Sequence, residues 1–497
     1  MTTLQEMVRG ALAADPAQPM IEFEGRWHDR GAVARLADLV GRLLETSGAG
    51  PDGAVTFVPR NEPAAIAALL GFLAQGRTVR MVYAFQAPAG IARDIARLRS
   101  AVVVLAARDL SPEARAAIEA QGAAAITLDG MDARFVDGCE QAHPERAAPA
   151  IGEPLVEILT SGTTGPPKQF PVAQAMLAKH HVAPRLAPGH EAEIAAEPPM
   201  LLFMPGGNIS GLYTVLPTLL RGQRAVLLDR FSIAGWHDYL VRYRPAAFGM
   251  PPSAVQSILD ANYPPEDLAS VKFFGVGAAP LDPSVQRAFE ERYGIPIILS
   301  YGATEFGGPV CAMTPDLHRD YGAAKIGSVG RAMPGASLRV VDPDTGVEAP
   351  RGTIGLLEVI SQRLEPTWLR TSDLALIDDD DFLFIKGRAD GAIMRGGFKV
   401  LPETIERALM LHPAVSGVSV VAVPDHRLGQ VPGAAIEFRP GAARPSAAEL
   451  EQHLRQHVLA THVPVHWRFV DTLPRNASEK FDRPGVVRLF ENTAQAA

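Results

Sequence analysis

A dense polar segment, Leu159–Lys168 (LTSGTTGPPK), carries the clearest chemical signal in this sequence. It continues a short apolar run, Val156–Leu159, which is typical of a β-strand. Glycines let the backbone approach an anion closely, and successive backbone N–H groups can surround phosphate oxygens. The hydroxyl side chains add further donors, and Lys168 adds a positive charge. The segment therefore predicts a phosphate-binding loop rather than an ordinary polar turn.

The same segment differs from the P-loop of kinases and ATPases. That loop ends in Gly-Lys-Ser/Thr, whereas here Pro167 precedes Lys168 and Gln169 follows it. A P-loop nucleotide-binding protein is therefore disfavoured, and the phosphate-binding loop must belong to another class of protein.

Other segments along the chain complete a pattern. They are Phe274–Leu281 (FGVGAAPL), Tyr301–Glu305 (YGATE), Gly327–Gly335 (GSVGRAMPG), Thr371–Asp373 (TSD), Gly387–Glu406 (GRADGAIMRGGFKVLPETIE) and Pro474–Arg483 (PRNASEKFDR). Together with the polar loop, they resemble the adenylate-forming superfamily, which contains acyl- and aryl-CoA synthetases, nonribosomal adenylation domains and luciferases. Each short motif is weak by itself, but the series follows the family's order and covers nearly the whole chain.

The resemblance implies an enzyme that activates a carboxylic acid with ATP. The carboxylate attacks the α-phosphate, so the site must supply positive charge and oriented donors where two anions meet. By resemblance, the residues that hold the β- and γ-phosphates would be Thr160, Ser161, Gly162, Thr163, Thr164, Gly165 and Lys168. Tyr301 would stack on the adenine, and Asp373 and Arg388 would hold the ribose hydroxyls. The remaining nucleotide-lining residues would be Gly277, Ala278, Ala279, Gly302 and Ala303.

Three residues would take part in the chemistry directly, again by resemblance. Thr304 would donate to a phosphate oxygen, and Glu305 would hold Mg²⁺, a hard cation that prefers oxygen ligands. Lys480 would bridge the carboxylate and the α-phosphate as charge develops between them. The resemblance thus implies ATP, Mg²⁺ and a carboxylic acid as the components of the first step.

Three positions depart from the family's pattern. Ser372 replaces the usual glycine before Asp373, and Asn208 stands where the family often has a histidine or an aromatic residue. Glu479 replaces the glycine before Lys480, and its carboxylate could weaken adenylation if it points inward. A catalytically impaired adenylate-binding homologue is therefore one alternative to an active ligase.

The acid pocket is expected to be lined by small or apolar residues. Relatives that activate amino acids place an aspartate after the aromatic residue that ends the preceding strand, but here Met204 and Pro205 follow Phe203. An α-amino acid is therefore disfavoured, and a hydrophobic fatty or aryl acid is expected. The candidate pocket residues are Asn208, Ile209, Met250, Gly275, Gly277, Ala303, Phe306, Gly307 and Gly308.

Coenzyme A is the expected acceptor of the acyl group. Asp390 matches the family's hinge position, and Gly396 and Gly397 after it would let a pantetheine arm pass close to the backbone. No carrier-protein domain follows Lys480 in the sequence. The expected activity is that of an acyl-CoA synthetase, and an acyl-AMP ligase that loads a separate acyl-carrier protein is the alternative.

The elements that must position these residues are those of an α/β protein. Apolar strands alternate with helical segments up to about residue 330, which predicts largely parallel sheets covered on both faces. Short strands joined by turns follow, and then helix Pro402–Leu411, strand Val415–Pro424 and helix Ala447–His457. We expect a large N-terminal domain, residues 1–387, with two α/β sheets and a small β unit. A small mobile α+β lid, residues 388–497, would complete the chain.

The overall composition limits the other possibilities. The 497 residues carry a net charge of −8 at pH 7, which disfavours nucleic-acid binding. Two cysteines, Cys139 and Cys311, exclude a disulfide framework and a cysteine-rich zinc site. His180 and His181 are adjacent rather than four apart, so no helical metal site is expected there.

No secretory signal or membrane-spanning stretch is expected, because the most apolar segment, Ala64–Ala74, is too short to cross a bilayer. We expect a cytoplasmic enzyme of fatty-acid metabolism that is a monomer or a homodimer.

Overall fold

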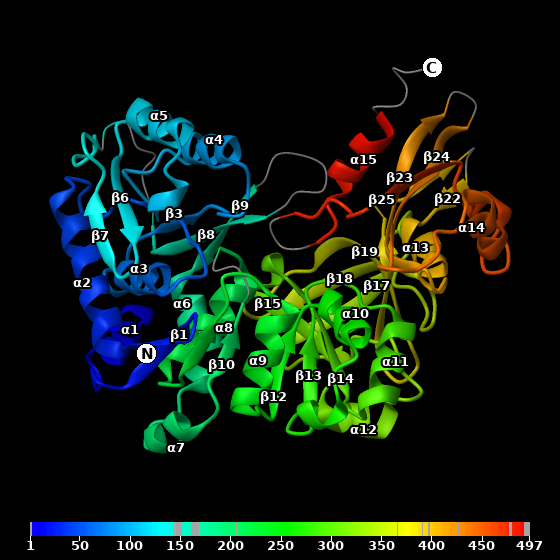
Figure 1. Ribbon diagram of the computed structural model, residues 1–497, viewed down its shortest axis with the longest axis horizontal. Coiled ribbons are helices and arrows are strands. Elements are labelled where there is room, and N and C mark those ends of the chain that lie inside the picture. Colours follow the sequence, from blue (N-terminus) through cyan, green and yellow to red (C-terminus); the bar gives the residue numbers. More distant parts are fainter. Residues whose placement is uncertain are drawn as a thin grey trace. The chain divides into compact units, whose positions relative to one another are not determined.

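The computed structural model describes residues 2–143, 145, 152–160, 168–203, 207–364, 366–389, 391–395, 398–425, 428–476 and 480–491. The chain divides into two compact units (Figure 1). The first comprises Met1–Ala278 with Gly302–Pro309, and the second comprises Ala279–Tyr301 with Val310–Ala497.

A seven-stranded sheet is the centre of the first unit, with the strand order β7-β6-β5-β3-β4-β8-β9. Its inner pairs are parallel, and the pairs at the two edges, β6 with β7 and β8 with β9, are antiparallel. The strands are β3 (Val55–Val58), β4 (Val79–Met81), β5 (Val102–Ala106), β6 (Ala124–Asp129), β7 (Asp132–Phe135), β8 (Leu155–Thr160) and β9 (Lys168–Ala173).

Helices cover both faces of this sheet, as continuous apolar strands require. In β5, Val102 and Val104 join the core under α2 (Arg30–Thr46) and α3 (Pro63–Ala74). The alternate residues, Val103 and Leu105, join a second core. That core lies under α4 (Pro88–Leu98) and α5 (Pro112–Gln121), seen above the sheet in Figure 1.

A second sheet in the same unit has the order β10-β11-β1-β2, from β10 (Met200–Leu202), β11 (Ala225–Leu227), β1 (Pro19–Phe23) and β2 (Arg26–Asp29). Strands β12 (Ala247–Met250) and β13 (Phe273–Val276) pair in parallel and are the first two strands in the sheet order β12-β13-β14-β15-β16. The remaining helices of the unit are α1 (Leu4–Ala13), α6 (Gln174–Leu177), α7 (Glu191–Ala196), α8 (Ile209–Leu220), α9 (Ile233–Tyr243) and α10 (Pro252–Ala261). Strands β14 (Ile297–Ala303) and β15 (Gly308–Ala312) carry residues of both units.

The second unit contains an antiparallel four-stranded sheet with the order β17-β18-β19-β20. Its strands are β17 (Ala336–Val341), β18 (Gly355–Ser361), β19 (Leu369–Ile377) and β20 (Leu383–Arg388). The unit also contains α11 (Pro283–Tyr293), α12 (Pro315–Tyr321) and the short β16 (Arg331–Ala332).

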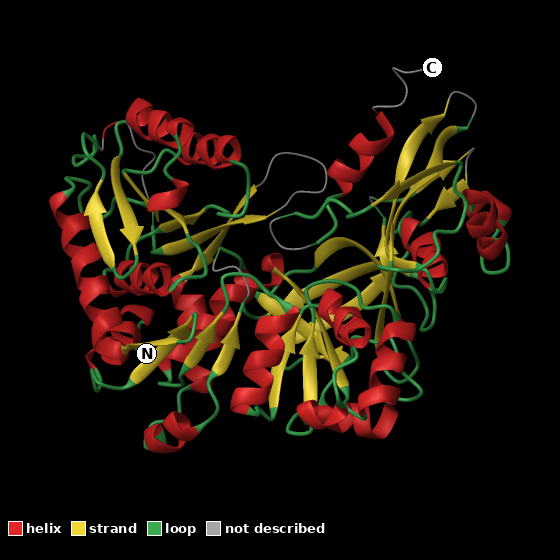
Figure 2. Ribbon diagram, in the orientation of Figure 1, coloured by secondary structure: helices red, strands yellow, loops and turns green. Residues whose placement is uncertain are grey.

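In the C-terminal part of the second unit, helices pack on both faces of one sheet (Figure 2). Its sheet has the order β22-β21-β24-β23, with β25 parallel to β24. Val420 and Ala434 face one core with α13 and α14, whereas Val421 and Ala435 face another core with α15. The elements are β21 (Ile393–Arg395), β22 (Phe398–Val400), α13 (Pro402–Met410), β23 (Val415–Asp425), β24 (Gly429–Phe438), α14 (Ala447–Leu454), β25 (His466–Val470) and α15 (Arg483–Glu491).

The predicted fold class, a mixed α/β protein with a large N-terminal and a small C-terminal domain, is confirmed. The boundary predicted between residues 387 and 388 lies inside the second compact unit and stays a prediction, as does the mobility of the lid. The predicted helix Ala447–His457 ends earlier, at Leu454. Within the described residues, no helix has both the length and the apolar character that crossing a membrane requires.

Candidate active site

The polar loop joins two neighbouring antiparallel strands in the first unit. Thr160 ends β8, Lys168 begins β9, and the two residues are partners in the ladder. The backbone therefore places both at the base of the loop. The loop residues predicted to surround phosphate, Ser161, Gly162, Thr163, Thr164 and Gly165, lie outside the described residues.

A tight turn in the first unit carries the predicted phosphate and metal ligands. Thr304–Phe306 forms a single 3₁₀ turn that ends at Gly307, whose φ is +68° and whose N–H donates to the Thr304 carbonyl at 3.0 Å. Gly302 lies so close to Gly308 that a Cβ on Gly302 would be 2.5 Å from the Gly308 carbonyl oxygen. The backbone conformation of residues 303–307 is thus closely restricted, and with it the direction in which their side chains point.

Glu305 and Thr304 are half-buried on this turn. Within the described part of the chain, no hydrogen bond or ion pair engages the Glu305 carboxylate or the Thr304 hydroxyl. No group of three or more His, Cys, Asp or Glu among the described residues could hold a metal ion. One carboxylate plus a hydroxyl fits Mg²⁺ nevertheless, because that ion is commonly held by one or two carboxylates together with substrate phosphates and water.

The predicted adenine turn has an unusual backbone. Ala278, between Gly277 and Ala279, adopts a φ of +69°. Residues other than glycine are strained in this region, and such strain is concentrated at functional sites. The strain supports the choice of this turn as part of a ligand site.

The predicted acid-pocket residues all belong to the first unit. Ile209, Met250 and Phe306 are buried, and Met250 ends β12 next to the strand that carries Gly275. Asn208 has a structural role that the sequence did not reveal: its Oδ1 accepts from the Gly211 N–H at 2.7 Å and caps α8. Three of the predicted pocket residues thus have buried apolar side chains, whereas the Asn208 side chain caps a helix.

In the second unit, three of the predicted nucleotide ligands meet. The Tyr301 hydroxyl donates to Oδ2 of Asp373, and Arg388 Nη1 donates to Oδ1 of Asp373 at 3.3 Å. Asp373 and Arg388 are partners across β19 and β20, which explains their contact. The Ser372 hydroxyl also bonds to Arg388, so the residue that replaces the family's glycine helps to orient the guanidinium.

Burial raises the pKa of Tyr301 far above its usual range, and the charge of Asp373 and its hydrogen bond add to this rise. Tyr301 therefore stays protonated at every physiological pH and acts as a donor to Asp373. The carboxylate is held on both oxygens and presents a fixed acceptor, which suits recognition of a diol.

Lys480 is hydrogen-bonded to Asn476 in the second unit. Its N–H donates to Asn476 Oδ1 at 3.1 Å, and its carbonyl accepts from the Asn476 N–H at 2.8 Å. Arg475 and Phe481 form an isolated bridge around this pair. The side chain of Lys480 is exposed. The preceding Glu479 lies outside the described residues.

The predicted hinge and tunnel residues Asp390, Gly396 and Gly397 also lie outside the described residues. Two glycines that flank the hinge lie close to the ends of the Glu403 and Arg483 side chains. A Cβ on Gly387 would lie 2.7 Å from Glu403 Oε2, and one on Gly391 would lie 2.7 Å from Arg483 Nη1. Arg483 in turn donates to Glu403 Oε1 at 2.8 Å, so this ion pair adjoins the hinge segment.

Sequence reasoning missed His181 as a functional candidate. Its spacing from His180 was considered only as evidence for or against a metal site. The side chain is buried, and its Nε2 lies 2.8 Å from the carbonyl oxygen of Gly307. No local sequence signal reveals this contact, because 126 positions separate the two residues.

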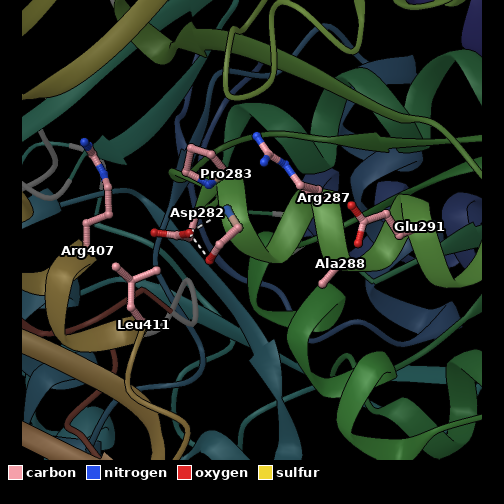
Figure 3. A pocket seen from close by; sticks show the side chains of 8 residues that line it. Asp282, Pro283, Arg287, Ala288, Glu291, Arg407 and Leu411 are labelled. Carbon is pink, nitrogen blue, oxygen red and sulfur yellow. Dashed lines mark hydrogen bonds between the residues drawn. The ribbon is translucent and has the colours of Figure 1, made fainter.

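A surface groove of about 370 Å³ lies elsewhere in the second unit, where side chains of α11 face the end of α13 (Figure 3). Its lining residues are Asp282, Pro283, Ser284, Arg287, Ala288, Glu291, Arg407 and Leu411. None of them is a predicted site residue, so the groove is distinct from the candidate site.

Two family models match the chain. A model described as AMP-binding enzyme matches residues 8–364, and a model of the AMP-binding enzyme C-terminal domain matches residues 404–480. The chain belongs to the adenylate-forming family of AMP-binding enzymes. The predicted family is thereby confirmed.

Named relatives of this AMP-binding enzyme are CoA ligases. Sulfoacetate–CoA ligase from Cupriavidus necator is 30% identical over 97% of this chain and 96% of its own length. 4-Coumarate–CoA ligase 3 from Oryza sativa subsp. japonica is 27% identical over 97% of this chain and 91% of its own length. These relatives confirm the expected enzyme class, an AMP-forming acid–CoA ligase.

A solved structure shows the same fold. The crystal structure of ATP-bound MatB from Rhodopseudomonas palustris superimposes with a TM-score of 0.79 at 23% identity, covering 99% of this chain and 100% of that one.

Proposed function

We propose that this enzyme converts a carboxylic acid to an acyl-adenylate and then to a CoA thioester. In the first step a carboxylate oxygen attacks the α-phosphorus of ATP, and the bond to the β-phosphate breaks to release pyrophosphate. In the second step the thiolate of coenzyme A attacks the acyl carbon, and AMP leaves. The contact of Tyr301 and Arg388 with Asp373 carries the proposal, because it creates a preorganised acceptor for a ribose diol.

The roles of the other residues follow from their chemistry. Lys480, whose side chain is exposed, supplies a positive charge to the attacking carboxylate and the α-phosphate. Lys168 and the loop Thr160–Gly165 bind the β- and γ-phosphates. The turn at Thr304 supplies a hydroxyl donor, and Gly277, Ala278, Ala279, Gly302 and Ala303 line the nucleotide.

Glu305 would hold Mg²⁺ in this proposal. The ion, when bound, neutralises phosphate charge. Glu305 serves that purpose because its carboxylate is half-buried on a tight turn and has no partner within the described residues.

We propose a hydrophobic fatty or aryl acid as the substrate. The buried side chains of Ile209, Met250 and Phe306 support an apolar wall. The relatives named above act on sulfoacetate and on 4-coumarate, so the family's acids range from small and charged to aromatic. An acyl-carrier protein as acceptor, and an impaired enzyme in which Glu479 disables Lys480, are the alternatives.

We also propose a cytoplasmic location, because Cys139 and Cys311 are both buried free thiols, which suits a reducing compartment. A monomeric or homodimeric state stays a prediction.

A panel of aliphatic, aryl and sulfonated acids tests the proposal. We expect acid-dependent ATP–pyrophosphate exchange with a hydrophobic acid, and a thioester once coenzyme A is added. Exchange without a CoA thioester, but with loading of a carrier protein, would favour the carrier-protein ligase. No exchange with any acid would favour the impaired homologue, and restoration of exchange by Glu479→Gly would locate the cause.

A further inference from the structure

His181 donates a hydrogen bond to the turn that carries Glu305. Its Nε2 is 2.8 Å from the Gly307 carbonyl oxygen, and a carbonyl oxygen only accepts, so Nε2 carries the proton. The residue is only 8% exposed, so little water competes for this bond. The bond is therefore a direct link between a buried side chain and the end of the 3₁₀ turn.

Gly307, whose carbonyl accepts this bond, is the residue at which the turn ends. Gly307 takes up a left-handed conformation, and its own N–H returns to the Thr304 carbonyl at 3.0 Å. The turn is only three residues long, so most of its N–H and C=O groups need partners from outside it. A donor aimed at the Gly307 carbonyl thus restrains the segment that sets the direction of Glu305.

The imidazole ring also stacks on a side chain of α8, the helix that carries the predicted pocket residue Ile209. The His181 and Tyr213 rings are stacked, with centroids 5.7 Å apart and an interplanar angle of 19°. Tyr213 lies on α8, which begins at the Asn208 cap. His181 belongs to a π-helical segment, Ala178–Val182, and such segments often occur at functional sites.

We propose that His181 is a positioning residue that holds the Thr304–Gly307 turn in the geometry in which Glu305 meets Mg²⁺ and ATP. This inference rests on the proposed function of Glu305. The competing explanation is that His181 only fills space between α8 and the turn.

Two variants separate these explanations, because each keeps one half of the histidine's contacts. His181→Phe keeps an aromatic ring for Tyr213 and removes the donor, whereas His181→Gln keeps an N–H donor and removes the ring. A positioning role predicts that His181→Phe is the impaired variant. A space-filling role predicts that His181→Gln is the impaired one. His180→Phe, at the half-buried neighbouring position, is the matched control.

Binding of α,β-methylene-ATP, measured by calorimetry with and without Mg²⁺, gives a readout that does not depend on turnover. Loss of one hydrogen bond to the turn should raise the Kd in the presence of Mg²⁺ by about 3- to 10-fold in His181→Phe. Without Mg²⁺ the Kd should stay within about twofold of the native value. His181→Gln and His180→Phe should both bind as the native enzyme does in either condition.

Amide hydrogen exchange of residues 304–308 provides a second readout. Exchange should be faster in His181→Phe alone, since the turn has lost a restraint. Native Mg²⁺-dependent binding by His181→Phe, or equal loss in His181→Phe and His181→Gln, would overturn the inference.

Glu305→Gln distinguishes the inference from the function on which it rests. If Glu305→Gln weakens Mg²⁺-dependent binding and His181→Phe does not, only the positioning role is wrong. If Glu305→Gln binds as the native enzyme does, the metal role of Glu305 is wrong and the inference fails with it.

Discussion

A carboxylate held on both oxygens is the best-defined functional feature at the scale of single residues. Asp373 accepts from Tyr301 on one oxygen and from Arg388 on the other, and Ser372 bonds to the same guanidinium. A charged acceptor fixed in this way loses little freedom when it binds a hydroxyl group. Recognition of the ribose by Asp373 would therefore depend on partners that do not themselves touch the sugar.

Substitutions in this cluster should lower ATP affinity to different degrees. Asp373→Ala should raise the KM for ATP by about 10- to 100-fold, because it removes the charge-assisted acceptor. Tyr301→Phe should raise it by about 2- to 10-fold, because it removes only a hydrogen bond that orients Asp373. ATP–pyrophosphate exchange at varied ATP measures both effects. Equal effects of the two changes would contradict the role of Asp373 as the direct ligand.

At the scale of elements, one buried carboxylate joins three strands of the antiparallel sheet in the second unit. Glu358 on β18 lies opposite Arg339 on β17 and Arg370 on β19. Arg339 Nε donates to Oε2 at 2.8 Å, and Arg370 Nε donates to Oε1 at 2.8 Å. Burial of Glu358 acts to raise its pKa, but the hydrogen bonds from Arg370 and Arg339 outweigh this, so the pKa is lowered.

This lowered pKa predicts a pH-dependent contribution to stability. The contribution is fully present above the ordinary pKa of a glutamate and disappears as the pH falls through the lower folded value. Glu358→Gln should reduce the free energy of unfolding of this unit by about 1.5–3 kcal/mol near pH 7. The difference from the native protein should shrink below about pH 4.

Urea-unfolding midpoints at pH 7 and pH 3.5 test this expectation, with Glu348→Gln as the control because Glu348 is exposed. A destabilisation by Glu358→Gln that is independent of pH would mean that packing, rather than charge, gives Glu358 its effect.

At the scale of the whole molecule, the expected reaction has two steps that need different groups at one acyl carbon. In the proposed mechanism Lys480 serves the first step, and the predicted tunnel residues Gly396 and Gly397 serve the second. A hinge at Asp390 would let the lid present these groups in turn, and a few hinge residues can absorb such a change. Gly387, which precedes the predicted hinge, has a φ of +147°, a conformation that side chains other than glycine rarely adopt.

The two half-reactions should therefore respond to different substitutions. Lys480→Ala should abolish adenylate formation and leave the conversion of a supplied acyl-adenylate to the thioester largely intact. Asp390→Pro should do the reverse, because proline fixes φ near −65° and restricts the hinge. Single-turnover assays of each step provide the measurement. If both variants lose both steps to the same degree, the two-state lid is wrong for this enzyme.

The sequence by itself determined the family, the enzyme class and most of the elements. Local patterns suffice for these, because short continuous apolar runs select strands, and Pro63, Pro112 and Pro283 each begin a helix. The motifs could be recognised for the same reason, since each is a short run whose spacing is set by one turn or one strand end.

Only the tertiary structure decided which side chains meet. Tyr301 and Asp373 are 72 positions apart, and His181 and Gly307 are 126 positions apart, so neither contact leaves a local pattern. The register of β19 against β20 places Asp373 opposite Arg388, and the cap of α8 engages Asn208. Strand register and helix packing follow from burial across the whole unit. This is why the sequence could suggest Asp373 as a candidate ligand but could not show which residues hold its carboxylate.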